Sequence, residues 1–207
     1  LSALGCLPQN EIGGIALGHM LNRRGRIECE VTIFRQDDER YYLVCAAFFE
    51  QRLLDHLTQN NKSEKVQITS LSESYSALAL NGPYARDVLA ACTDTSLTNA
   101  DFRWLTGRTI EIAGHEVMAM RLSYAGELGL ELHMPNAAYL DVYKALTEAG
   151  ERYGITDYGS FAMNVMRMEK AFKGAGELTN EVTLPEADVM RFVNPEKAFL
   201  GKAETLA

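Results

Sequence analysis

Two stretches of the chain each predict a hairpin followed by a helix. Between residues 26 and 34, apolar and polar side chains alternate, and Glu30 and Thr32 share the polar face. This period of two is typical of a half-buried strand. A polar turn then leads to a second strand over residues 41–46 and to a helix over about residues 48–59.

The same order returns in the second half of the chain. We expect strands over residues 116–123 and 128–134 and a helix over about residues 136–150. Leucines alternate with Glu131 along the second strand, so Glu131 is expected to face away from the core, with Tyr124 on the opposite arm of the hairpin. The repeat predicts an α+β fold built from two related hairpin–helix units of the ferredoxin-like kind.

Two glycines frame the turn of the second hairpin. Gly126 and Gly129 supply the backbone freedom that a sharp reversal requires. A glycine beside Glu131 would also let a flat ligand approach the main chain closely.

The remaining segments predict single elements. Residues 66–69 and 75–80 read as strands, and Pro83 opens a helix that runs to about residue 91. A further helix is expected over about residues 160–171. Four apolar residues are expected to form the inward face of this last helix: Phe161, Val165, Met168 and Phe172.

Composition and charge narrow the class of protein. Of the 207 residues, 47% are hydrophobic, and 28 acidic residues against 20 basic ones give a formal net charge of -8. An acidic chain without a basic cluster argues against nucleic acid and anionic membranes as partners. No apolar run approaches the roughly 18 residues of a membrane span, so we expect a soluble, cytoplasmic protein.

The cysteines and histidines predict no metal site. The cysteines at positions 6, 29, 45 and 92 show neither Cys-x-x-Cys pairing nor association with the four histidines. A disulfide framework is therefore not expected. We expect the protein to occupy a reducing compartment. Cys29 lies on the apolar side of its strand, where a buried, small, unreactive side chain is expected.

Five motifs occur in the order found in one protein family. Together they resemble the aminomethyltransferase superfamily, which contains the T-protein of the glycine cleavage system and the folate-binding region of dimethylglycine and sarcosine dehydrogenases. The ending is more similar to the dehydrogenase branch. The motifs are residues 20–32, 78–83, 124–131, 166–172, and 176–188 with 199–202.

This resemblance implies a function and an incomplete domain. Residues 1–207 would form the folate-binding domain, without the strand and helix that precede it and the small β-barrel that follows it in the family. The ligands would be tetrahydrofolate and a one-carbon donor, with methylenetetrahydrofolate formed from an N-methyl or aminomethyl group. The chain would be the transferase domain of a larger enzyme, together with a flavin dehydrogenase domain or partner.

The resemblance also assigns roles to two residues of the second hairpin. A pterin ring presents two parallel N–H donors that one carboxylate can accept together, and a glutamate on a rigid strand suits this task. Glu131 takes this role by resemblance, and Tyr124 would pack and hydrogen-bond near the reactive nitrogens. The alternative for Glu131 is a solvated charge on the outer face of a strand.

A second carboxylate would act beside the nitrogens that receive the one-carbon unit, where positive charge develops. By register with the family this residue is Glu30, with Thr32 on the same face. The family usually has aspartate there. The extra methylene moves the carboxylate by about 1.5 Å, and a misplacement of about 1 Å can cost roughly a hundredfold in rate.

Two further candidate residues lie in the fourth motif. Phe172 can stack on a flat ring, and a core aromatic is the alternative of equal weight. Arg167 is expected to form a structural ion pair on its helix, with a contact to the glutamyl tail of folate as the alternative.

Other functions within the superfamily stay open. The first is a non-catalytic folate-binding or assembly protein, although the iron–sulfur-assisting branch carries a cysteine near residues 170–176 that this chain lacks. The second is a noncatalytic subunit of a multisubunit sarcosine oxidase, which tends to lose the carboxylate that Glu131 retains.

Overall fold

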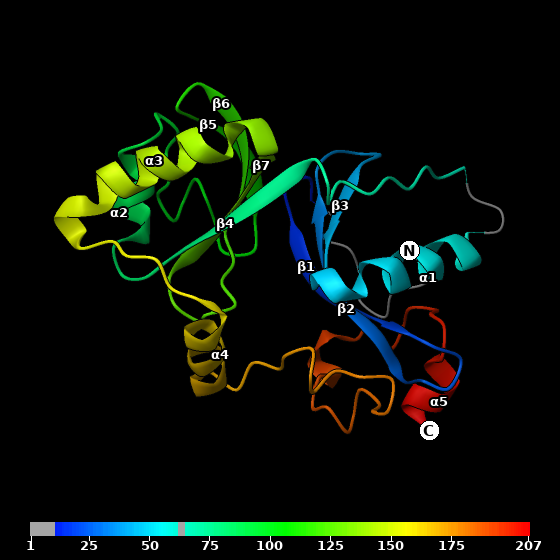
Figure 1. Ribbon diagram of the computed structural model, residues 1–207. Coiled ribbons are helices and arrows are strands. Elements are labelled where there is room, and N and C mark those ends of the chain that lie inside the picture. The colour runs from blue at the N-terminus through cyan, green and yellow to red at the C-terminus, as the bar shows by residue number, and fades with distance from the viewer. Residues whose placement is uncertain (1–10, 62–64) are drawn as a thin grey trace. The chain divides into compact units, whose positions relative to one another are not determined.

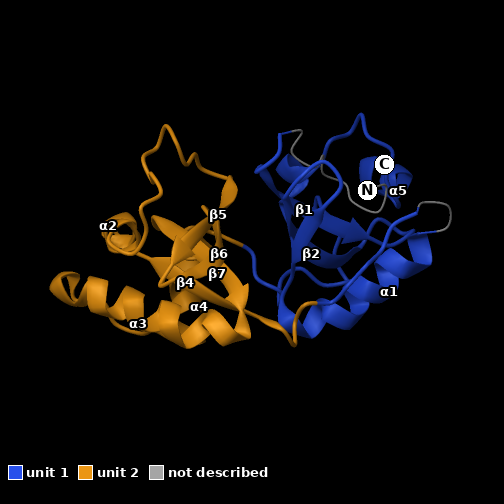
Figure 2. Ribbon diagram, turned by 90° about the horizontal axis from the view of Figure 1, so that it is seen from above, with its two compact units in different colours: residues 1–70, 173–207 blue, residues 71–172 orange. Residues whose placement is uncertain are grey.

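The computed structural model describes residues 11–61 and 65–207. The chain divides into two units, coloured separately in Figure 2. Unit 1 comprises residues 1–70 and 173–207, and unit 2 comprises residues 71–172. That residues 1–207 form a single domain stays a prediction.

Unit 1 contains the first predicted hairpin and helix (Figure 1). Its antiparallel sheet has the order β1–β2–β3, and the apolar face of β2 packs with Leu53 of α1. The alternation expected around Glu30 is confirmed, since Cys29 and Val31 are buried whereas Glu30 is half-buried. The elements of unit 1 are β1 (Ile15–Leu21), β2 (Ile27–Arg35), β3 (Tyr41–Val44), the 3-10 turn η1 (Ala47–Phe49), α1 (Glu50–Asn60), η4 (Met190–Phe192) and α5 (Lys202–Leu206).

Two features of unit 1 differ from the expectation. Strand β1 was not predicted, because most of its residues are buried on both faces and the sequence therefore shows no alternation. The strand predicted over residues 66–69 is wrong, since these residues are exposed and pair with no strand. The alternating apolar residues at positions 66–69 belong to an exposed connection and not to a strand.

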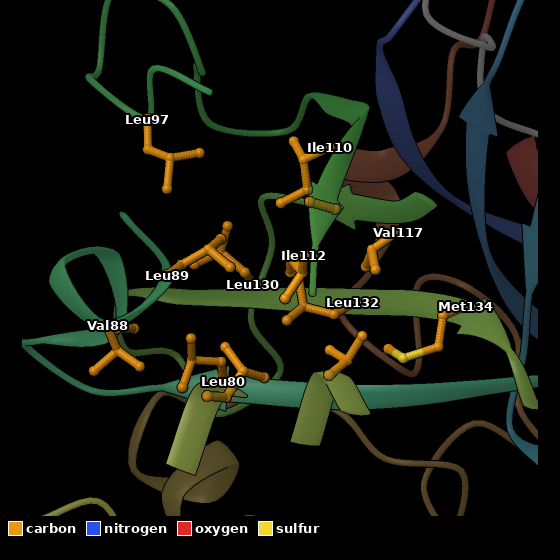
Figure 3. Packing of buried hydrophobic residues seen from close by; sticks show 14 of the residues in the cluster. Leu80, Val88, Leu89, Leu97, Ile110, Ile112, Val117, Leu130, Leu132 and Met134 are labelled. Atoms are coloured by element: carbon orange, nitrogen blue, oxygen red, sulfur yellow. The ribbon is translucent and has the colours of Figure 1, made fainter. Parts of the chain in front are cut away.

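Unit 2 contains the second hairpin in a four-stranded antiparallel sheet of order β4–β7–β6–β5. Strand β7 lies inside this sheet, and Leu130, Leu132 and Met134 point into a core with residues of α2 and α3 (Figure 3). The elements of unit 2 are β4 (Tyr75–Asn81), α2 (Ala85–Ala90), β5 (Gly107–Ile112), β6 (His115–Met120), β7 (Gly129–Pro135), η2 (Asn136–Ala138), α3 (Tyr139–Gly150), η3 (Glu151–Tyr153) and α4 (Ser160–Glu169).

The hairpin of β5 and β6 was also missed. Its two-residue turn places Ala113 at φ 51° and Gly114 at φ 78°. Turns of this kind are normally signalled by Asn-Gly or Asp-Gly, because a positive φ is unfavourable for alanine. The turn chemistry therefore concealed a strand whose own alternation, with Ile110 and Ile112 buried, is regular.

The inward face predicted for the last helix is wrong. Phe161 is 91% exposed, and Val165 and Met168 are 53% and 52% exposed. The only residue of α4 that is buried is Arg167. Helical spacing shows that a helix has an apolar face, but it does not show that a core covers this face.

Each unit repeats one arrangement: an antiparallel hairpin, a single 3-10 turn and a helix. In unit 1 this is β2, β3, η1 and α1, and in unit 2 it is β6, β7, η2 and α3. The predicted α+β class is confirmed. None of the helices within residues 11–61 and 65–207 is long and apolar enough to cross a membrane.

Candidate functional site

In unit 1, Glu30 lies opposite a buried histidine. Antiparallel pairing of β1 with β2 places His19 directly across from Glu30. His19 is 2% exposed, and its Nε2 lies 3.2 Å from Oε1 of Glu30. The ring is not aligned for a hydrogen bond, and neither of its nitrogens has a hydrogen-bond partner among the described residues. The carboxylate of Glu30 therefore keeps lone pairs available beside a buried imidazole.

The two acidic residues on this face of β2 have different surroundings. Glu28 accepts a hydrogen bond from Nδ2 of Asn22 at 2.8 Å and lies 3.8 Å from Nη1 of Arg52. These contacts give Glu28 a structural role. Glu30 contacts His19 instead, and Thr32 is half-buried on the same face. Of these two carboxylates, that of Glu30 is the one beside the buried imidazole, and its role toward a ligand stays a prediction.

In unit 2, Glu131 lies on β7 between strands β4 and β6, paired with Ala79 and Met120. Its half-buried side chain faces away from Leu130 and Leu132, as predicted. The polar face is nevertheless covered in part, since His133 is 4% exposed and its Nε2 lies 3.4 Å from Oε2 of Glu131. A half-buried carboxylate on an internal strand has a fixed position.

A network of neutral polar groups lies in the same unit. Ser123 donates a hydrogen bond to Oδ1 of Asn81 at 2.7 Å, and Nδ2 of Asn81 donates to the hydroxyl of Tyr158. Burial raises the pKa of Tyr158, and the negative charge of Glu131 adds to this shift, whereas the hydrogen bond from Asn81 opposes it. Tyr158 thus keeps its proton near Glu131 and offers a hydroxyl there.

Tyr124 lies in the connection between β6 and β7. The expectation that it stands on a strand arm is wrong, because β6 ends at Met120 and the strands pair only from there. Its side chain is 36% exposed. The connection turns at Gly126, whose φ of 72° confirms the predicted backbone freedom.

Phe172 follows α4 and is half-buried. Its carbonyl accepts a hydrogen bond from Nη1 of Arg167 at 2.8 Å, and the guanidinium also donates to Oδ1 of Asn164. These hydrogen bonds hold the segment that carries Phe172. The ion pair expected for Arg167 on its helix, and the alternative contact with the glutamyl tail of folate, stay predictions.

Gly129 does not leave room for a ligand. A Cβ at this position would overlap Oδ1 of Asn81 and would lie 2.6 Å from Cβ of Ser123. The close approach that the sequence indicated at this glycine is thus made by protein side chains. Gly129 lets the Asn81–Ser123 pair pack against β7, two residues before Glu131.

Replacing Gly129 with alanine is expected to destabilise the protein by about 1–3 kcal/mol, the usual cost of overpacking a filled site. The measurement is urea unfolding followed by circular dichroism. Gly176→Ala is the matched control, since a Cβ there meets nothing within 4 Å. Equal stability of the two variants would contradict the packing described for Gly129.

The structure therefore groups the predicted residues by unit. Glu30 and Thr32 belong to unit 1, whereas Tyr124, Glu131 and Phe172 belong to unit 2. That one ligand reaches both groups stays a prediction. Among residues 11–61 and 65–207, no cluster of three or more His, Cys, Asp or Glu side chains could hold a metal ion.

Sequence reasoning missed three residues of these surroundings. His19 was one of four scattered histidines. It lies on β1, the strand that was not predicted, and it comes opposite Glu30 through the pairing of β1 with β2. Asn81 and Tyr158 come together over a long sequence separation, so no local pattern could have connected them. His133, in contrast, was accessible through its shared strand face with Glu131.

Comparison with protein families and curated proteins gives consistent matches. The family model described as the GCVT N-terminal domain matches residues 5–197. The mouse protein named dimethylglycine dehydrogenase, mitochondrial, is 33% identical over 197 residues, covering 93% of this chain and 23% of its own length. The aminomethyltransferase of Thermoanaerobacter sp. (strain X514) is 31% identical over 185 residues, covering 88% of this chain and 50% of its own. The chain thus spans half or less of these relatives.

A solved structure supports the fold. The glycine cleavage system aminomethyltransferase T from Bartonella henselae superposes with a TM-score of 0.84 at 24% identity, covering 99% of this chain and 55% of that chain. The heterotetrameric sarcosine oxidase from Corynebacterium sp. U-96 gives a TM-score of 0.55 at 18% identity over 75% of this chain. The predicted resemblance is confirmed.

Proposed function

Because the chain belongs to the GCVT N-terminal domain family, we propose that it binds tetrahydrofolate and transfers a one-carbon unit to it. The product is methylenetetrahydrofolate, and the donor is an N-methyl or aminomethyl compound. The observation that carries this proposal is the position of Glu131: a half-buried carboxylate on an internal strand of unit 2, facing away from the core.

The surroundings of Glu131 fit the edge of a pterin ring. A fixed carboxylate accepts two parallel N–H donors together, and such charge-assisted hydrogen bonds are the stronger kind. The hydroxyl of Tyr158 adds a neutral group close enough for the charge of Glu131 to raise its pKa. Tyr124 and Phe172 are the aromatic residues of unit 2 that we assign to contacts with the ligand.

Glu30 is proposed to act on the reacting carbon. When bound, tetrahydrofolate supplies the nitrogens that accept the one-carbon unit. The carboxylate of Glu30 stabilises positive charge near those nitrogens and holds or moves their proton. His19, at 3.2 Å from Glu30, limits the directions in which this longer side chain can point. Thr32 offers a hydroxyl on the same face.

The partial coverage of the relatives supports a place in a larger enzyme. The chain covers 23% of mouse dimethylglycine dehydrogenase and 18% of human sarcosine dehydrogenase. We therefore propose that it is the folate-dependent part of such an enzyme, supplied by a flavin dehydrogenase domain or partner. A non-catalytic folate-binding role is the alternative.

The proposal is tested by calorimetric titration with tetrahydrofolate. Replacing Glu131 with glutamine is expected to weaken binding by about tenfold or more, because a hydrogen bond to a charged group contributes about 1.5–3 kcal/mol. The amide keeps the size of the side chain, but it loses the charge and can accept only one of two parallel donors.

Glu116→Gln is the matched control for this titration. Glu116 lies on β6 of the same sheet, where it is exposed, so the change removes an equal charge. Unchanged affinity is expected for this variant. Equal affinities of the wild-type protein and Glu131→Gln would reject the assignment of Glu131, and no binding by the wild-type chain would reject the function proposed for it.

A further inference from the structure

Two arginine side chains of unit 2 converge on one amide oxygen. Arg86 lies on α2, and Arg121 directly follows β6. Nη2 of Arg86 donates a hydrogen bond to Oδ1 of Asn99 at 2.8 Å, and Nη2 of Arg121 donates to the same oxygen at 2.7 Å. A neutral acceptor thus holds two positively charged groups beside each other.

The two guanidinium groups have no acidic partner. Among residues 11–61 and 65–207, no Asp or Glu side chain forms an ion pair with Arg86 or Arg121. The carboxylate of Asp101, in the connection between α2 and β5, accepts hydrogen bonds from two hydroxyl groups of that connection instead. Burial lowers the pKa of Arg121, and the positive charge of Arg86 adds to this shift. The pair therefore carries positive charge without a counter-ion from the described chain.

Both guanidinium groups keep donors for a ligand. Each arginine side chain has five N–H donors. Within the part of the chain that the structure describes, the side chain of Arg86 donates only the hydrogen bond to Asn99. Arg121 also donates to the carbonyl of Phe102, and its Nε is buried without a described hydrogen-bond partner. Asn99 is exposed and Arg86 is half-buried, so an anion from solvent can reach the pair.

The core of unit 2 fixes the positions of α2 and of Asn99. Val88 and Leu89 anchor α2 in the buried cluster of this unit (Figure 3). Leu97 and Phe102 belong to the same cluster, so the connection that carries Asn99 is anchored on both sides. Donors that are fixed before a ligand arrives lose less conformational entropy when it binds.

We propose that Arg86, Asn99 and Arg121 form a binding site for the phosphate group of a small molecule. The planar fork of a guanidinium matches the oxygens of phosphate and carboxylate. Phosphate is favoured here, because its charge of about −2 matches two guanidinium groups and its three terminal oxygens can accept from both forks. This inference does not rest on the proposed folate chemistry, because tetrahydrofolate carries no phosphate.

The test is calorimetric titration of the folded chain with inorganic phosphate, at constant ionic strength with chloride as the exchanged anion. Saturable binding is expected for the wild-type protein. Replacing Arg86 with glutamine should weaken it by about tenfold or more, because one of the two charged forks is lost. Arg86→Lys keeps the charge without the fork and should have an intermediate affinity. Acetate should bind about tenfold more weakly than phosphate or worse, since a monoanion matches only one of the two charges.

Asn99→Asp is the second variant, and it keeps the shape of the side chain. Its carboxylate would become the counter-ion of both guanidinium groups, so the affinity for phosphate should fall by about tenfold or more. In chloride, the midpoint of thermal unfolding should be higher for this variant than for the wild-type protein. Phosphate should raise the midpoint of the wild-type protein, because a ligand stabilises the folded state that binds it, and should leave that of Asn99→Asp unchanged.

Arg40→Gln is the matched control. Arg40 lies in unit 1 and is paired with Asp37, so the change removes an equal charge away from the site. Its affinity for phosphate should equal that of the wild-type protein, and circular dichroism establishes that each variant is folded. An absence of saturable phosphate binding by the wild-type chain would overturn the proposal, as would equal affinities of the wild-type protein and Asn99→Asp. Equal affinities for phosphate and acetate would reject phosphate as the ligand group.

Discussion

Replacing Glu30 with glutamine is expected to slow formaldehyde-dependent formation of methylenetetrahydrofolate by about 100-fold or more, the usual loss when a proton-transferring group is removed. Glutamine keeps the length of the side chain and its place opposite His19, but it removes the charge that stabilises a positive carbon. The rate is measured with saturating tetrahydrofolate, after subtraction of the uncatalysed reaction.

Shortening the side chain tests its position. Glu30→Asp withdraws the carboxylate by about 1.5 Å, away from the 3.2 Å contact with His19. Although the family usually has aspartate here, the longer side chain contacts His19 in this chain, so we expect the displaced charge to slow the reaction without changing the affinity for folate. His19→Gln should slow the reaction less than either change at position 30, since it alters the orientation of Glu30 and not its charge.

Glu28→Gln is the control for both changes, because Glu28 is on the same strand face but is held by Asn22 and Arg52. Its rate per folded molecule should match the wild-type rate. If Glu30→Gln and Glu30→Asp also matched it, the chain would be a folate binder without a catalytic carboxylate at position 30. That result would favour the non-catalytic alternative.

The elements that alternation could predict are those with one apolar and one polar face. Strand β2 and strand β7 both have this form, and the sequence alone placed Glu30 and Glu131 correctly on the face opposite the core. In strand β1, most residues of both faces are buried. Burial on both sides removes the period of two that identifies a strand.

Local sequence patterns gave wrong predictions where burial and strand pairing depend on distant segments of the chain. The apolar positions of α4 have helical spacing, yet Phe161 is 91% exposed. Tyr124 shares a short motif with Glu131, but the sheet pairs only up to Met120, so the tyrosine lies in the connection. The end of a strand depends on which residues find pairing partners, which sequence spacing does not specify.

The sequence predicted the two carboxylates of the candidate site, but it did not predict the residues that contact them. The strand faces of Glu30 and Glu131 were predicted correctly, whereas their roles toward folate stay predictions. His19 and the Asn81–Tyr158 pair depend on contacts between segments far apart in sequence. Such partners become visible only with the register of the strands.

Replacing Leu132 with alanine is expected to destabilise the protein by about 2–5 kcal/mol, the range for large-to-small changes in a packed core. Leu132 has no exposed surface and lies on β7 inside the sheet of unit 2 (Figure 3). Its neighbours on the adjacent strands are Leu78 and Ala119. The free energy of unfolding is measured in urea at two wavelengths, to detect separate transitions of the units.

Leu140→Ala on α3 is the control, since Leu140 is 56% exposed and should change the free energy of unfolding by no more than about 0.5 kcal/mol. Leu132→Met should cost less than about 1.5 kcal/mol, because it conserves volume. A loss in Leu132→Ala no larger than in Leu140→Ala would contradict the assigned core. Because Glu131 is the next residue on the same strand, the loss would also remove the rigid support on which its proposed role depends.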